Sequence, residues 1–242
     1  MHYSLEVCDA FNAALQRLRT EASQRPILIG VDGRAGSGKT IFSHLLAAHL
    51  GRIGGRAVRL RYDTFWVAGQ EYQALVAAMP ELAVSRRQPG DYDYAWQHCR
   101  DRLLAGLRKG LRAGMAADPG LETLLAACRA DAAATKSDAG DPHAGDPHAA
   151  DWVILEGTTC LRRELRPSYD LSLLLRLDPQ TCLRQLLARE QGVGAEYFLK
   201  VWMPLEARYF EEHQPEAAAD FVIDTLPARS AFSLKSAVSA AG

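Results

Sequence analysis

The chain has 242 residues, of which 48% are hydrophobic and 24% are charged. This composition supports a sizeable buried core and excludes a globally disordered chain, a coiled coil and a collagen-like chain. The 28 basic and 29 acidic residues give a formal net charge of -1, so no overall field attracts nucleic acid or an anionic membrane. We therefore expect a single domain over residues 1–242 with no nucleic-acid and no membrane partner.

The five cysteines form no CxxC pair, which favours reduced thiols over a disulfide framework or a zinc site. The first residues lack a basic region followed by an apolar segment. No run approaches the roughly 18 apolar residues of a membrane span. These features predict a cytoplasmic protein, and the sequence leaves its oligomeric state open.

Hydrophobic periodicity predicts the elements in chain order. Residues 5–20 have the spacing of an amphipathic helix, and the short apolar run Ile27–Val31 is typical of a strand covered on both faces. Further strands are predicted over 57–61, 152–155, 171–175 and 221–223, and further helices from 41 to about 51 and over 70–79, 94–113, 180–190 and 195–213. Strands that alternate with helices predict an α/β fold of three layers around a five-stranded parallel sheet.

Two segments fall outside this alternation. Residues 131–150 contain a tandem Ala-Gly-Asp-Pro-His repeat, whose composition cannot bury a core and predicts a flexible insertion. The repeat carries His143 and His148, but the ligands that a metal site would need are sparse around them, so a solvated linker is the preferred interpretation. Residues 230–242 are expected to form a loose C-terminal tail.

The clearest motif is Gly33-Arg34-Ala35-Gly36-Ser37-Gly38-Lys39-Thr40, a full match to the P-loop pattern GxxxxGK followed by Ser or Thr. A predicted buried strand precedes it and a predicted helix follows, as the motif requires. Backbone N–H groups of such a loop turn toward phosphate oxygens, and the helix N-terminus adds a partial positive charge. We expect Lys39 to reach the β- and γ-phosphates and Thr40 to ligate Mg²⁺. The motif predicts binding of ATP or GTP.

A GTPase would also need a guanine-reading motif, and Thr135-Lys136-Ser137-Asp138 fits TKxD by letter. It lies in the low-complexity insertion, no apolar strand leads into it, and no DxxG motif follows the P-loop. These observations argue against a GTPase.

Three further places carry candidate catalytic groups. Asp63 follows the predicted strand 57–61, at the sheet edge where open α/β folds bind ligands, and is a candidate general base; the alternative is a turn-capping Asp. Glu156 ends the strand 152–155 and is the candidate ligand of the Mg²⁺ shell. Arg184 and Arg189 approach the end of a helix that Asp178 caps, where a lid could bring them to the transferred phosphoryl group, although exposed helix arginines are often only solvated.

Together these residues resemble the uridine kinase-like family of P-loop kinases, which includes phosphoribulokinase and bacterial pantothenate kinase. The resemblance runs from about Ile27 to Asp224. Asp63-Thr64-Phe65-Trp66 is similar to the family's Asp-x-Phe-Tyr segment, Glu156-Gly157 to its Glu-Gly, and Arg189-Glu190 to the Arg-Asp that ends its lid helix. The resemblance implies that Asp63 deprotonates the acceptor hydroxyl and that ATP is the donor.

The acceptor is less well defined by the sequence. The stretch 87–93 resembles the family's Asp-His-Pro-x-x-Phe-Asp, but Arg87 stands where uridine kinases carry a ribose-binding Asp. An arginine there suits an acceptor that already carries a phosphate or carboxylate. Trp66 and Tyr92 could stack on a base or belong to the core.

We therefore expect an ATP- and Mg²⁺-dependent kinase that phosphorylates a hydroxyl of a small molecule, a nucleoside or a similar metabolite. The substrate-binding residues would be Asp63, Trp66, Arg87 and Tyr92. The alternative is a regulatory P-loop ATPase or nucleotide switch that acts on a macromolecular partner.

Overall fold

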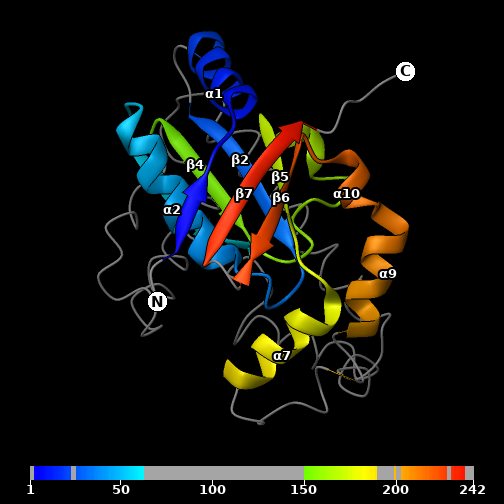
Figure 1. Ribbon diagram of the computed structural model, residues 1–242. Coiled ribbons are helices and arrows are strands. Elements are labelled where there is room, and N and C mark those ends of the chain that lie inside the picture. Colours follow the sequence, from blue (N-terminus) through cyan, green and yellow to red (C-terminus); the bar gives the residue numbers. More distant parts are fainter. Residues whose placement is uncertain are drawn as a thin grey trace, which may run out of the picture.

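The computed structural model describes residues 3–22, 26–62, 150–189, 199, 203–227 and 230–237. Its centre is a seven-stranded sheet with the order β1-β7-β6-β5-β2-β4-β3 (Figure 1). The strands are β1 (Ser4–Glu6), β2 (Ile27–Gly33), β3 (Ala57–Arg61), β4 (Trp152–Glu156), β5 (Leu171–Arg176), β6 (Phe221–Leu226) and β7 (Ala231–Ala237). Every pairing is parallel except that of β6 with β7.

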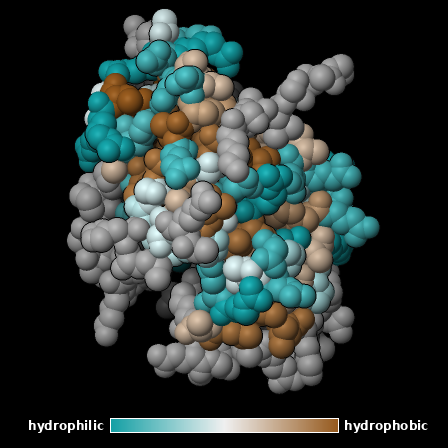
Figure 2. Space-filling view, in the orientation of Figure 1, coloured by the Kyte–Doolittle hydropathy of each residue, from teal (hydrophilic) through white to brown (hydrophobic). Residues whose placement is uncertain are grey.

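Helices lie between the strands along the chain. They are α1 (Asp9–Glu21), α2 (Lys39–Arg52), α7 (Pro179–Arg189), α9 (Met203–His213) and α10 (Pro215–Ala218), with the short 3-10 helix η4 at Arg166–Ser168. Hydrophilic residues cover α1 and α9 in the view of Figure 2, and hydrophobic residues gather over α7 at the bottom of the picture. Among the described helices, none is both long enough and apolar enough to cross a membrane.

Each face of the sheet has its own hydrophobic core. Alternate residues of a strand point to opposite faces, and in β2 Ile29 belongs to one core and Leu28 to the other. The first core includes Phe11 of α1 and Leu46 of α2, and the second includes Leu161, which follows β4. Because β2 is buried on both faces along its whole length, its apolar run has no polar alternation. The strand therefore holds the loop that follows it in the middle of the sheet.

The structure confirms the mixed α/β class and the five predicted strands, but it corrects the strand count from five to seven. The two added strands pair with each other, since Ser4 of β1 is in register with Ala231 of β7. The start of the helix expected over 5–20 is part of β1, and residues 231–237 form β7 where a loose tail was expected. Such long-range pairing leaves no local signal in a three-residue strand.

Several sequence predictions fall on residues that are not described. The helices expected over 70–79 and 94–113, and the insertion except for its last residue Ala150, lie outside the described ranges.

Candidate active site

The loop between β2 and α2 carries the P-loop motif, and it is held by close contacts from α7. Gly36 and Gly38 have φ values of 84° and 91°, a region that residues with a side chain rarely adopt. A Cβ atom on Gly36 would lie 2.4 Å from the carbonyl oxygen of Cys182 in α7. These glycines therefore let the loop turn tightly under α7.

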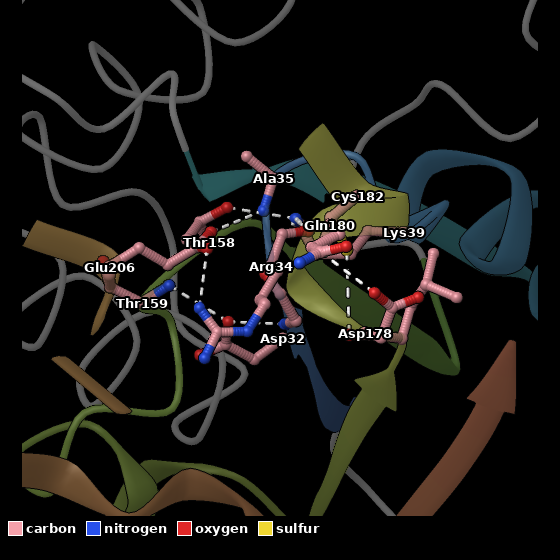
Figure 3. A network of polar contacts seen from close by, with 12 residues as sticks. Asp32, Arg34, Ala35, Lys39, Thr158, Thr159, Asp178, Gln180, Cys182 and Glu206 are labelled. Carbon is pink, nitrogen blue, oxygen red and sulfur yellow. Dashed lines mark hydrogen bonds and ion pairs between the residues drawn. The ribbon is translucent and has the colours of Figure 1, made fainter. Parts of the chain in front are cut away.

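Lys39, the first residue of α2, folds back over this loop. Its Nζ donates hydrogen bonds to the carbonyl oxygens of Gly33 and Arg34, both at 2.9 Å, and to Thr158 Oγ1 at 3.0 Å (Figure 3). Ser37 of the same loop is fully buried, and its Oγ has no hydrogen-bond partner among the described residues. A buried polar atom without a partner and an ammonium group at a helix N-terminus fit a phosphate group.

Thr40 and Glu156 meet beside Lys39. Glu156 ends β4 in register with Val31 of β2, so the two motifs meet at the same edge of the sheet. The Oγ1 of Thr40 donates a hydrogen bond to Glu156 Oε1 at 3.2 Å, and the Glu156 side chain is 5% exposed. A hydroxyl and a carboxylate are hard oxygen donors of the kind that Mg²⁺ prefers, and Mg²⁺ takes few protein ligands when phosphates complete its shell. The residues present therefore fit a Mg²⁺–nucleotide complex.

Asp32, the residue before the motif, is a buried hub that ties three segments together. Its Oδ1 accepts from the backbone N–H groups of Gly33 at 2.6 Å and Thr159 at 3.0 Å. Its Oδ2 accepts from the N–H of Leu161 at 2.8 Å and from the Tyr209 hydroxyl at 2.6 Å. Burial raises the pKa of the Asp32 carboxyl, while the hydrogen bonds from Tyr209, Leu161 and Gly33 lower it. The hub fixes the start of the P-loop relative to β4 and α9.

Glu206 of α9 contacts the P-loop at Arg34 and Ala35. Its carboxylate accepts the backbone N–H of Ala35 at 2.6 Å and forms an ion pair of 3.0 Å with Arg34 (Figure 3). The Arg34 guanidinium also lies over the Phe210 ring, 4.2 Å from its centre, which is a favourable cation–π distance. Burial raises the pKa of the Glu206 carboxyl, and the Ala35 N–H, Lys39 and Arg34 oppose that effect. A buried carboxylate thus sits beside the lysine that would bind phosphate.

The helix α7 begins with the predicted cap. Asp178 Oδ1 accepts the N–H groups of Gln180 at 3.0 Å and Thr181 at 3.1 Å. Arg184 donates to Thr181 Oγ1 at 2.7 Å, a contact within its own helix. Burial raises the pKa of the Cys182 thiol to about 12, so this cysteine is not a nucleophile at neutral pH.

The structure brings together some of the predicted site residues. Lys39, Thr40 and Glu156 meet at one sheet edge. The hydrogen bond of Arg184 described above goes instead to Thr181, which is not a predicted site residue. Arg189 is the last residue of α7. The remaining predicted residues, which are Asp63, Trp66, Arg87 and Tyr92, lie outside the described residues.

Sequence reasoning missed four residues that shape the site. They are Asp32, Arg59, Thr158 and Glu206, which are all buried. Two of them carry a signal in the sequence, since Asp32 is a charged residue in the otherwise apolar β2 and Arg59 stands between two apolar residues of β3. A charged residue is rarely fully buried unless it is paired. Thr158 and Glu206 reach the P-loop only through the tertiary fold, and no spacing predicts them.

No protein-family profile and no curated protein sequence matches the chain. One similar solved structure is a protein from Bacillus stearothermophilus, provisionally named a uridine kinase, with a TM-score of 0.46 and 17% identity over 88% of this chain and 98% of the other. Another, from Silicibacter sp. TM1040 and provisionally named a fructose transport system kinase, has a TM-score of 0.43 and 16% identity over 86% of this chain and 89% of the other. At such values neither likeness assigns an activity to this chain.

Proposed function

We propose that the chain is a Mg²⁺-dependent kinase that transfers the terminal phosphoryl group of ATP to a hydroxyl of a small metabolite, a nucleoside or a related compound. The observation that carries this proposal is the meeting of Lys39, Thr40 and Glu156 at the N-terminus of α2. An ammonium group, a hydroxyl and a carboxylate at the end of a P-loop are the groups that bind a metal–nucleotide complex in phosphoryl transfer.

The residues of the chain have distinct roles in this proposal. The backbone N–H groups of the first turn of α2 lack acceptors within the helix and can donate to phosphate oxygens. Lys39, which Thr158 and two loop carbonyl groups orient, neutralises the terminal phosphates. Thr40 and Glu156 would hold Mg²⁺, which when bound neutralises charge on the phosphates. Arg184 and Arg189 would approach the phosphates from α7.

The proposed binding of the acceptor rests on where its residues stand in the sequence, beginning with Asp63 after β3. β3 ends at Arg61, which is in register with Glu156, and Asp63 follows two residues later. We propose that Asp63 accepts the proton of the acceptor hydroxyl, with Trp66 and Tyr92 binding the acceptor and Arg87 binding a phosphate or carboxylate that it carries. A positioned general base contributes roughly 10² to 10⁴ in rate.

The experiment is ADP release from Mg²⁺-ATP, measured with nucleosides, nucleotides, sugars and pantothenate as acceptors. We expect one class of acceptor to stimulate ADP release. Lys39→Met should lose nucleotide binding, and Asp63→Asn should lose the stimulated rate while it still binds ATP. A preference for phosphorylated over free acceptors would support the role of Arg87.

The result that contradicts the proposal is slow hydrolysis that no acceptor stimulates and that Asp63→Asn leaves unchanged. That result would favour a regulatory ATPase stimulated by a macromolecular partner, because Lys39, Thr40 and Glu156 serve hydrolysis equally well.

A further inference from the structure

Arg59 of β3 places a buried positive charge beside the carboxylate of Glu156. Its side chain is 3% exposed, and its Nη2 lies 3.8 Å from Glu156 Oε1. This is the oxygen that also accepts the hydrogen bond from Thr40. A guanidinium group is costly to bury unless it is paired. Arg59 therefore pairs with the same carboxylate that would hold the metal.

Contacts from α2 fix the guanidinium group in this position. The Nε of Arg59 donates to Ser43 Oγ at 3.0 Å, and Ser43 Oγ donates in turn to the Thr40 carbonyl oxygen at 3.0 Å. The Nη1 of Arg59 lies 2.7 Å from Nε2 of His44. Arg59 is thus held by the same turn of α2 that carries Thr40, and it cannot swing away without breaking these contacts.

These contacts create a competition between two positive charges for one carboxylate. Without a metal, the positive charge of Arg59 stabilises the buried negative charge of Glu156. With a divalent cation on Glu156, the guanidinium group is a like charge in a poorly solvated environment, and such repulsion is much stronger than in water. The arrangement stabilises the metal-free site and weakens the binding of a metal that arrives alone.

We propose that Arg59 is a positioning residue that acts as the fixed counter-cation of Glu156 and lowers the affinity of the site for a free divalent cation. The inference rests on the proposed nucleotide and Mg²⁺ site. Its consequence is that the metal binds tightly only together with the nucleotide, whose phosphates add the negative charge that outweighs Arg59. The metal then leaves with the product nucleotide.

The test is the binding of Mn²⁺, as a spectroscopic substitute for Mg²⁺, to nucleotide-free protein followed by electron paramagnetic resonance. We expect Arg59→Met to bind Mn²⁺ on the order of tenfold more tightly than the unmodified protein, since a neighbouring like charge has been removed. Arg59→Lys keeps the charge and should stay within about threefold. Arg17→Met, at an exposed position of α1, removes a distant charge and should leave Mn²⁺ binding unchanged.

Because Arg59→Met removes a positive charge beside a buried carboxylate, the variant is expected to be less stable without metal. Thermal unfolding is therefore measured with and without Mn²⁺. We expect Mn²⁺ to raise the Tm of Arg59→Met more than that of the unmodified protein. The variant Arg59→Met with Glu156→Gln removes both charges and should fold with no Mn²⁺ response.

Two failures are distinguishable. If the unmodified protein binds Mn²⁺ with ADP but Arg59→Met binds free Mn²⁺ no more tightly and gains no extra thermal stability from it, the role of Arg59 is wrong and the proposed function stands. If the unmodified protein binds no Mn²⁺ even with ADP, both are wrong.

Discussion

The hub at Asp32 makes a quantitative prediction about Asp32→Asn, which keeps the shape of the side chain and replaces one oxygen by an N–H₂ group. The four donors around Asp32 leave this amide no orientation without a loss. If the N–H₂ group faces Gly33 and Thr159, two backbone N–H groups lose their acceptor. If the N–H₂ group faces Leu161 and Tyr209, only the Leu161 N–H group loses its acceptor, because the tyrosine hydroxyl can turn and accept a hydrogen bond. The second orientation is therefore preferred.

The magnitude follows from that single orphaned N–H group. A buried donor without an acceptor costs about 1–3 kcal/mol. The remaining hydrogen bonds weaken because their acceptor is no longer charged. A neutral amide costs less to bury than a carboxylate, and this offsets part of the loss. We expect Asp32→Asn to lower the free energy of unfolding by about 2 kcal/mol, and to weaken nucleotide binding because the Gly33 end of the P-loop is less firmly held.

The assay is urea unfolding followed by tryptophan fluorescence, with Asp151→Asn as the matched control. Asp151 accepts a single exposed N–H group, that of Arg56 at 2.6 Å, and the amide oxygen of asparagine can replace it. The control should change stability by no more than about 0.5 kcal/mol. If Asp32→Asn is equally mild, the hub does not anchor the P-loop.

Three further predictions concern the same region. Gly36→Ala should destabilise the protein by at least about 1–2 kcal/mol because its Cβ would meet Cys182. Gly51→Ala, with open space around it inside α2, should stabilise the protein by about 1 kcal/mol. Urea unfolding of both variants tests this difference, and equal effects on stability would contradict it. Glu206→Gln should tighten ADP binding several-fold in calorimetry by removing the carboxylate beside Lys39, and weaker binding would refute the electrostatic reasoning. Burial lowers the pKa of His213 below 6.5, so the unfolded state binds more protons and the free energy of unfolding falls as pH drops through 6.5. His213→Asn should reduce this fall when unfolding is measured from pH 8 to 5. An unchanged slope would exclude His213 as the source of the pH dependence.

The sequence predicts the elements that have strong local patterns. Ile27 to Val31 is apolar throughout because β2 is covered on both faces, and the glycines and Lys39 mark the loop that follows. The meeting of Thr40 with Glu156 could be anticipated because the P-loop follows β2, Glu156 ends the neighbouring strand β4, and parallel strands end at the same sheet edge.

The rest depends on tertiary contacts that carry no periodic signal. Glu206 reaches Ala35 only because α9 packs across the second face of the sheet, and α9 could have presented other residues with the same helical pattern. β1 has three residues, too few for an alternation to be recognised. Its strand conformation comes from its partner β7, at the other end of the sequence.

The packing of β7 against the P-loop and α2 has a consequence for protein synthesis. Phe232 of β7 packs within 3.2 Å of the position of a Cβ on Gly38 and against the Phe42 ring, with ring centres 5.4 Å apart. A ribosome therefore completes the phosphate-binding motif long before it adds the aromatic residue that packs against it. A growing chain, or one that stops before Phe232, carries the motif without that support. The ability to hold a nucleotide should thus appear late, near the end of translation.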